Sequence, residues 1–502
     1  MTALFLSLLA FLYLSIGANF GLKGAFYGEG LILTTVMRIL SGELLYRDIA
    51  TVYPPGIFLL GLLGWKWIGA TLLADRIVSL IVQAALCGTL YATCRRIMSP
   101  LSSLLAFLAA LACLGRATLF GYPTLPALIF VFASLQALCA SLEDRSGLKL
   151  FWAGALAALA GLFRHEFALY LLIVFAVLAT FRRAGAKAFL FLAGFILLFA
   201  SWAVPLVLKG APLASALFLY LNPAYSRAMA LTFPAFDRAG AIHYVPLLTA
   251  AAGFLYLRLR RADRLFISLL LFHTISLVNF LNRPDRPHLA APLILSCPLF
   301  FFLMERYDLA FGKAKRRFSL IQAGAVALTL VFLFRPTVQR LHFLFVERRA
   351  ADVFHYTLDR LSEMSDSDPA GKALEEAVRF VVQQTKKDER IFVGLPRHDD
   401  PAAGDLLFYF LCDRLPAVRY QELGERGMTM SEEGQAAIIE ELEKQDVRWI
   451  AIHSFPKWDV SYRYPTKGAL LLDEYLRKQY QPSREFPPYR ILRKRPHPAS
   501  FD

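Results

Sequence analysis

Long apolar runs separated by short polar gaps occupy the first two thirds of the chain. An α-helix needs about 20 mainly apolar residues to cross the hydrocarbon core of a bilayer, and most of these runs approach that length. We therefore predict a polytopic α-helical membrane protein with about 11 transmembrane helices. The runs cover residues 2–20, 76–94, 101–115, 123–142, 148–163, 166–181, 187–208, 242–257, 264–281, 287–303 and 318–334.

The stretch 148–181 also permits one re-entrant hairpin, although two spans are the simpler interpretation. The first run lacks the basic residues that begin a signal peptide, so we expect it to remain as a span. Lysine and arginine favour the cytoplasmic side of a membrane. They gather in alternate gaps, which predicts a cytoplasmic N-terminus and an external C-terminal region. The basic gaps lie at 95–96, 145–149, 182–187, 258–264 and 306–317.

The pattern changes after residue 335. Short β-rich runs then alternate with segments of helical periodicity, which is typical of an α/β domain. We predict a transmembrane module at 1–335 and a small soluble extracytoplasmic α/β domain at 336–502, with a capping box formed by Thr429 and Glu432. Expected strands lie at Arg390–Val393, Trp449–Ile452 and Tyr489–Leu492, and expected helices at 340–361, 369–385, 431–445 and 468–478.

The composition agrees with a membrane protein. Of the 502 residues, 57% are hydrophobic, whereas ordinary soluble domains have about 45–50%. The net charge of +15 is compatible with a nucleic-acid partner. However, the basic residues lie in the gaps between apolar runs, where they set the orientation of a membrane protein. We therefore expect no nucleic-acid partner.

The cysteines and short motifs give no sign of a metal centre. Five of the six cysteines lie in or beside apolar runs, and Cys412 is alone in the soluble region, so no disulfide is expected there. No CxxC or HExxH motif occurs, which argues against structural zinc. Asp366-Ser367-Asp368 has the DxD form that holds a metal in nucleotide-sugar enzymes, but its position before Pro369 is typical of a solvated turn.

Charged residues collect in the gaps predicted to face outside. Any single one fits an ion pair at the headgroup layer, but together they indicate one polar cavity that faces outward. Two outside segments are long, 21–75 and 209–241, and the amphipathic stretches Leu31–Leu40 and Ile57–Trp67 of the first are suited to lying on the membrane. The charged residues are Glu29; Arg47 and Asp48; Arg164, His165 and Glu166; and Arg283, Asp285, Arg286 and His288.

Such a cavity has the groups that sugar transfer from a lipid phosphate requires. A carboxylate takes the proton of an acceptor hydroxyl as that oxygen attacks the anomeric carbon. Guanidinium groups bind the departing phosphate. Phosphate is already a good leaving group, so the reaction needs no general acid.

The first outside segment resembles a known loop. Tyr27-Gly28-Glu29-Gly30 is followed by Arg38-Ile39-Leu40-Ser41-Gly42-Glu43-Leu44-Leu45-Tyr46-Arg47-Asp48 and then by Tyr53-Pro54-Pro55-Gly56. This order is similar to the first external loop of GT-C glycosyltransferases, in the bacterial branch related to protein O-mannosyltransferases and the lipid A aminoarabinose transferase. Those proteins have an acid after the first span, a helix ending in G-x-x-x-Y-x-D, and a Pro-Pro or Gly-Pro element. The match covers about 30 residues, and the rest of the chain agrees only in layout.

The resemblance implies an inverting hexosyl- or pentosyltransferase. Its donor would be a polyprenyl-phosphate sugar, and its acceptor a hydroxyl of a glycan, lipid or protein. The loop acid maps onto Glu29, as base or acceptor-orienting group. Many relatives have two adjacent acids there, where this chain has Gly28 and Glu29. Asp48 falls at the second loop acid, which orients groups or binds a metal. Some relatives use a divalent ion and others do not, so the resemblance leaves a metal open.

The other candidates come from position outside the membrane, not from a motif. They are expected to bind the phosphate and the sugar, and the family branch implies a bacterial inner (plasma) membrane, in contact with membrane lipids, with a periplasmic or otherwise extracytoplasmic C-terminal domain. These candidates are Arg47, Arg164, His165, Glu166, Arg283, Asp285, Arg286 and His288.

Other functions fit the sequence less well. A transporter or flippase for lipid-linked glycans would place polar residues near mid-span and show two similar halves. This chain keeps its charges at the outer edge and shows no internal repeat. A polysaccharide polymerase or ligase would use similar chemistry without the loop pattern or the large external domain. A purely structural protein would not explain the acids and arginines outside.

Overall fold

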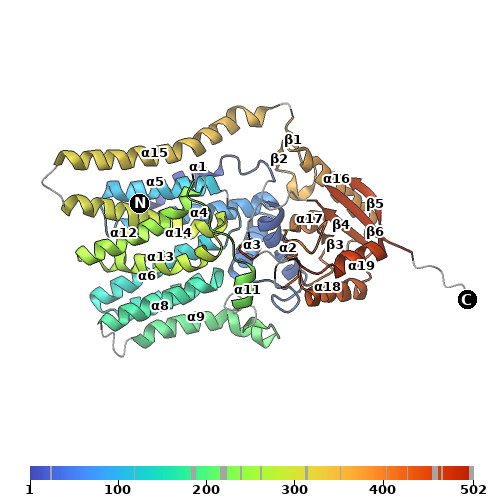
Figure 1. Ribbon diagram of the computed structural model, residues 1–502, viewed down its shortest axis with the longest axis horizontal. Helices are drawn as coiled ribbons and strands as arrows, with labels where there is room; N and C mark the ends of the chain where they lie inside the picture. Colours follow the sequence, from blue (N-terminus) through green and yellow to red (C-terminus); the bar gives the residue numbers. More distant parts are fainter. Residues whose placement is uncertain are drawn as a thin grey trace, which may run out of the picture.

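The computed structural model places a helical bundle beside a compact α/β domain, with two short helices of the first loop between them (Figure 1). The bundle helices lie roughly parallel to one another, and the domain caps one end of them. The structure describes residues 1–22, 25–117, 119–182, 188–214, 223–237, 240–260, 263–310, 315–350, 352–402, 404–424, 426, 428–454, 462–464 and 467–496.

A helix lies at each predicted apolar run. Within the residues that the structure describes, six helices are long and apolar enough to cross a membrane, which agrees with a multi-pass membrane protein. The number of spans and their orientation stay predictions. The helices are α1 (Thr2–Ser15), α4 (Leu72–Cys94), α5 (Pro100–Ala117), α6 (Thr124–Asp144), α7 (Gly147–Phe163), α8 (His165–Arg182), α9 (Ala188–Leu208), α12 (Val245–Leu259), α13 (Arg264–Asn282), α14 (Arg286–Ala310) and α15 (Lys315–Phe345).

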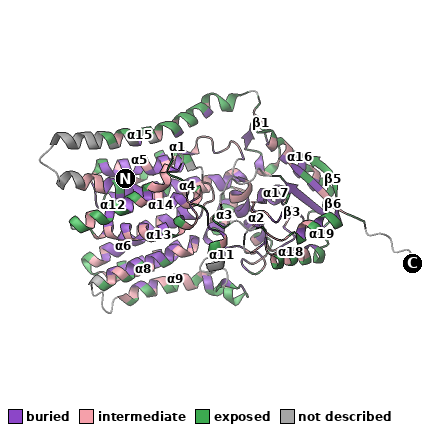
Figure 2. Cartoon of the chain, in the orientation of Figure 1, coloured by how far each residue is buried: buried purple, intermediate pink, exposed green. Residues whose placement is uncertain are grey.

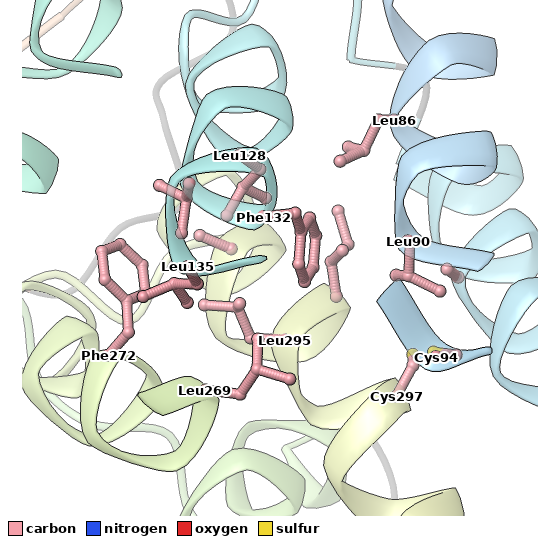
Figure 3. Close-up of a cluster of buried hydrophobic side chains, with 14 of the residues drawn as sticks. Leu86, Leu90, Cys94, Leu128, Phe132, Leu135, Leu269, Phe272, Leu295 and Cys297 are labelled. Atoms are coloured by element: carbon pink, nitrogen blue, oxygen red, sulfur yellow. The ribbon is translucent and has the colours of Figure 1, made fainter. Parts of the chain in front are cut away.

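The core of the bundle is apolar and closely packed. Side chains from α4, α6, α13 and α14 converge on it, including Leu90, Phe132, Phe272 and Leu295 (Figure 3). Outer helices such as α9 and α15 instead show much exposed surface (Figure 2). Exposed leucines and phenylalanines on outer helices are what a lipid-facing surface requires.

Residues 148–182 form two separate helices, α7 and α8. The break falls at Arg164, whose backbone is extended (φ −145°, ψ 100°). Helix α15 differs from the expected arrangement, because it continues through Pro336 to Phe345. The second half of the predicted helix 340–361 is instead β1 (Phe354–His355) and a short 3₁₀ turn.

The C-terminal region is an α/β domain, as predicted. Its four-stranded sheet has the order β3-β4-β6-β5, with β3 parallel to β4 and the other pairs antiparallel. Trp449 and Ala451 of β4 face one core, while Ile450 and Ile452 face the other. The elements are β2 (Ser365–Asp366), α16 (Pro369–Gln384), β3 (Phe392–Gly394), α17 (Leu406–Cys412), α18 (Glu432–Lys444), β4 (Trp449–His453), α19 (Leu471–Gln479), β5 (Tyr480–Phe486) and β6 (Tyr489–Lys494).

Two local predictions for this domain can be checked. The N-cap of α18 is Ser431, whose hydroxyl accepts from the backbone N–H of Gly434, so the capping box at Thr429 was wrong. Asp366 of the DxD sequence accepts hydrogen bonds from Leu22, Tyr356, Ser367 and Asp368. It therefore joins the chain near α1 to the C-terminal domain, as a structural residue.

The first loop packs into the C-terminal domain. Helix α2 (Gly30–Leu40) is buried from Gly30 to Arg38 and shares an apolar core with α17. The expectation that it lies on the membrane was wrong, because its apolar side chains meet a protein partner instead. Helix α3 (Gly56–Trp67) does expose Leu59, Leu63 and Trp67, as an interfacial helix would.

A buried acid in this domain predicts a pH effect. Burial raises the pKa of Asp405 to about 7, although Tyr489 and Phe408 donate hydrogen bonds to its carboxyl group. The folded state then holds the proton more tightly than the unfolded chain, so stability from this group is lost as pH rises towards 7. We expect the free energy of unfolding to fall by about 2 kcal/mol between pH 5 and pH 7. Thermal unfolding of the wild type and of Asp405→Asn measures this, and an equal decline in both would contradict it.

Candidate functional site

The first-loop acid lies in a buried ion pair. A single π-helical turn (Ala25–Glu29) leads directly into α2 and places Glu29 at the junction. Both oxygens of Glu29 accept from Arg76, Oε1 from Nε at 2.7 Å and Oε2 from Nη2 at 3.1 Å. Arg76 also donates to the carbonyl of Ala18 and lies over the ring of Phe120. The Glu29–Arg76 pair is thus held at the start of α4 by the Ala18 carbonyl and the Phe120 ring.

A second carboxylate lies next to this pair. Asp75 is in the first turn of α4, whose N-cap is Thr71. The Asp75 side chain lines a small cavity between α3, α4 and the residues that precede α6. Among the described residues, no hydrogen-bond donor reaches its Oδ2 atom, which is buried. The cavity is also lined by Ser79, Gly121 and Tyr122.

The break between α7 and α8 holds a second charged group. Arg164 is buried and forms an ion pair with Glu166, and Nε of Arg164 lies 2.6 Å from Oε1. His165 Nδ1 lies 3.8 Å from the other oxygen of Glu166, and Asn279 of α13 donates to Glu166 at 3.3 Å. The three residues predicted from Arg164-His165-Glu166 therefore form one cluster.

The connection between α13 and α14 adds to this cluster. Asp285 Oδ1 lies 2.5 Å from His288 Nδ1, and Arg283 Nη2 lies 3.6 Å from Asp285 Oδ2. Burial alone would raise the pKa of Asp285, but His288 and Arg283 outweigh it, so that pKa lies below its usual value. Asp285 is therefore ionised at neutral pH.

Electrostatic contacts link the clusters around Tyr122. The charges of Arg164, Glu166 and Asp285 act electrostatically on the Tyr122 hydroxyl. The Tyr122 side chain also lines the same cavity as Asp75. Arg164 also interacts electrostatically with His288, and Glu29 interacts electrostatically with Asp75. Acids and guanidinium groups from the first loop, the α7–α8 break and the α13–α14 connection thus surround one region.

Three predicted residues lie apart from this region. Arg47 and Asp48 pair with each other at 2.8 Å on an exposed turn, and Arg286 is exposed at the start of α14. Both oxygens of Asp48 are engaged by Arg47, and Oδ2 also accepts from the backbone N–H of Leu44. This arrangement shapes the loop and does not fit a metal ligand. Within the described ranges, no group of three or more His, Cys, Asp or Glu residues could hold a metal ion.

Sequence reasoning missed Asp75 and Arg76, because they sit at the edge of an apolar run. The signal was present: two adjacent charges of opposite sign at the start of a span are costly unless they have partners. It also missed Arg38 and Glu43, which connect the first loop to the C-terminal domain. Their partners lie about 350 residues further along the chain, where no local pattern points to them.

Solved structures of other proteins resemble the fold of this chain. The structure of ArnT from Cupriavidus metallidurans bound to undecaprenyl phosphate aligns over 98% of this chain and 97% of its own, with a TM-score of 0.58 and 13% identity. The chain has a GT-C fold. The apo structure of the same ArnT aligns equally well. An Archaeoglobus fulgidus oligosaccharyltransferase in complex with zinc and sulfate aligns more weakly, with a TM-score of 0.49 at 12% identity, over 89% of this chain and 68% of its own. No family model and no curated protein matches the sequence.

The likeness to ArnT covers both parts of the chain, the helical bundle and the α/β domain. The GT-C fold was therefore predicted correctly from the first loop and the layout of the chain. At 13% identity the likeness establishes the fold and not the substrate.

Proposed function

We propose that the chain is an inverting glycosyltransferase that moves a sugar from a polyprenyl-phosphate donor to a hydroxyl acceptor. The acceptor belongs to a glycan, a lipid or a protein. The reaction takes place on the outer face of the bacterial plasma membrane, with the C-terminal domain outside. The observation that carries the proposal is the convergence of carboxyl and guanidinium groups at one end of the bundle, around Tyr122.

The donor phosphate is the group that this convergence would bind. Arg283 has its guanidinium beside Asp285 in a half-buried position, and Arg164 is buried nearby. Charge-assisted hydrogen bonds to phosphate are stronger than neutral ones, and they strengthen further in a site that excludes water. The acidic residues accept hydrogen bonds from sugar hydroxyls or take the acceptor proton. The lipid chain would remain in the bilayer, next to the apolar helices.

Transport is the main alternative. A transporter needs polar groups near the middle of its spans. The acidic and basic side chains described above instead lie at the ends of α4, α8 and α14. This placement favours chemistry at one face over passage through the membrane.

The first test is transfer from a labelled polyprenyl-phosphate sugar by membranes that contain the full chain. We expect transfer by the wild type, and a donor KM raised about 10- to 100-fold by Arg283→Gln, since a hydrogen bond to a charged group contributes about 1.5–3 kcal/mol. Arg258→Gln is the matched control, because Arg258 is exposed in the last turn of α12. Transport of the donor without any transfer would overturn the proposal, and equal donor KM values in the two variants would remove Arg283 from the phosphate site.

A further inference from the structure

The two acids at the outer end of α4 are in different states. Both oxygens of Glu29 are taken by Arg76. A carboxylate bound by a guanidinium through both oxygens presents neither of them freely to an acceptor hydroxyl. Glu29 is therefore poorly suited to act as a base in the arrangement seen here.

Asp75 is in the opposite situation. Its side chain is 5% exposed, and within the described part of the chain its Oδ2 atom has no hydrogen-bond donor. A buried carboxylate oxygen without a partner is costly, so its retention calls for an explanation. It is a buried acceptor that can receive a donor from a ligand.

The surroundings show where such a donor would come from. Asp75 lines the cavity shared with Ser79, Gly121 and Tyr122, which has room for one group about the size of water. A methyl group built on Gly121 would lie 3.6 Å from Oδ2 of Asp75, so this oxygen faces the cavity wall formed by Gly121. The backbone of Gly121 is itself fixed by a hydrogen bond from its N–H to Ser79 Oγ at 2.8 Å. The cavity therefore accommodates a hydroxyl group, with the carboxylate oxygen beside it.

We infer that Asp75, and not the first-loop acid Glu29, takes the proton from the acceptor hydroxyl. In this step Oδ2 of Asp75 binds the hydroxyl proton while the hydroxyl oxygen forms a bond to the anomeric carbon of the donor. The bond between that carbon and the phosphate oxygen breaks, and polyprenyl phosphate leaves with the electron pair. Asp75 then returns the proton to water. The inference rests on the proposed function and assigns one residue within it.

Glu29 has a different role in this arrangement. Its ion pair fixes Arg76 in place, and the charge of Arg76 acts on the neighbouring Asp75. Glu29 is thus a positioning residue that acts through Arg76. We therefore expect removal of the charge at Asp75 and at Glu29 to change different kinetic parameters of the transfer reaction.

The experiment compares Asp75→Asn with Glu29→Gln in the purified full chain, using the labelled polyprenyl-phosphate sugar that the wild type accepts. We expect Asp75→Asn to lower kcat at least 100-fold and to leave the donor KM within threefold, since a general base contributes about 10²- to 10⁴-fold. The low-pH limb of the kcat profile should disappear in this variant. Glu29→Gln should keep that limb, change the donor KM through Arg76, and lower kcat less than Asp75→Asn does.

Other outcomes would overturn the assignment. Asp75→Asn with kcat within threefold of the wild type would exclude Asp75, and loss of the low-pH limb in Glu29→Gln alone would return the role to Glu29. If Asp75→Asn does not fold, Asp75→Glu keeps the charge and moves it by one methylene; unchanged kcat in that variant would count against contact with the hydroxyl, and a lowered kcat at unchanged donor KM supports it. A wild type that transfers no sugar would refute the proposed function, whereas a kcat for Asp75→Asn within threefold of that of an active wild type would refute only this assignment.

Discussion

Glu43→Gln is expected to separate the first loop from the C-terminal domain. Oε2 of Glu43 lies 2.5 Å from Arg38 Nε, and Oε1 lies 2.6 Å from Arg390 Nη2. Arg38 is 2% exposed and also donates to the carbonyls of Asp48 and Val418. Removing one member of a buried ion pair leaves the other charge without compensation, which costs about 3–5 kcal/mol. The melting temperature of the full chain and its transfer rate should both fall.

The matched control for this variant is Glu485→Gln. Glu485 pairs with Arg490 on the surface of the same domain, and both side chains are more than half exposed. An exposed pair contributes about 0–1 kcal/mol, so this variant should unfold like the wild type. A melting temperature for Glu43→Gln that equals that of Glu485→Gln would show that the loop is held by its apolar contacts alone.

Gly30→Ala is expected to displace the start of α2. A methyl group on Gly30 would lie 2.4 Å from the backbone nitrogen of Leu407 and 2.9 Å from the backbone carbonyl carbon of Leu406. The backbone of α17 cannot give way as a flexible side chain would, and such overpacking costs about 1–3 kcal/mol or more. Because Glu29 immediately precedes Gly30, the shift moves the Glu29–Arg76 pair. We expect the transfer rate to fall more than tenfold, measured with the labelled donor.

Gly28→Ala is the control for Gly30→Ala. A methyl group on Gly28 would meet no atom within 4 Å, although the same π-helical turn is changed. We expect its transfer rate and melting temperature to stay close to those of the wild type. Equal losses in the two variants would mean that the turn itself is sensitive and that contact with α17 is unimportant.

The helices of the bundle were predictable because their signal is local. Each apolar run in the sequence lies on a helix in the structure, since length and hydrophobicity within one segment are enough to mark a helix suited to a bilayer. The α/β character of the C-terminal domain followed in the same way from alternating periods. The break at Arg164 was also visible, as a charged triplet between two apolar runs.

The remaining features depend on contacts between distant segments. Amphipathic α2 carries the same pattern whether its apolar face meets lipid or protein, so its burial against α17 could not be read from residues 30–40. Likewise, the sequence placed Glu29 outside the membrane but could not show that Arg76 takes up both of its oxygens. Asp75 gave no periodic signal, and its charge at the edge of an apolar run does not show that it lies beside a cavity.

The shared core of α2 and α17 has a consequence for how the protein is made. Residues 30–40 leave the ribosome long before residues 406–412, and Leu31, Leu33 and Met37 meet Leu406 and Phe408 only when both segments are present. Contacts between such distant segments form late in folding. The apolar side chains of the first loop therefore stay exposed until the last third of the chain has been synthesised. A truncated chain that ends before residue 406 would leave this apolar surface exposed.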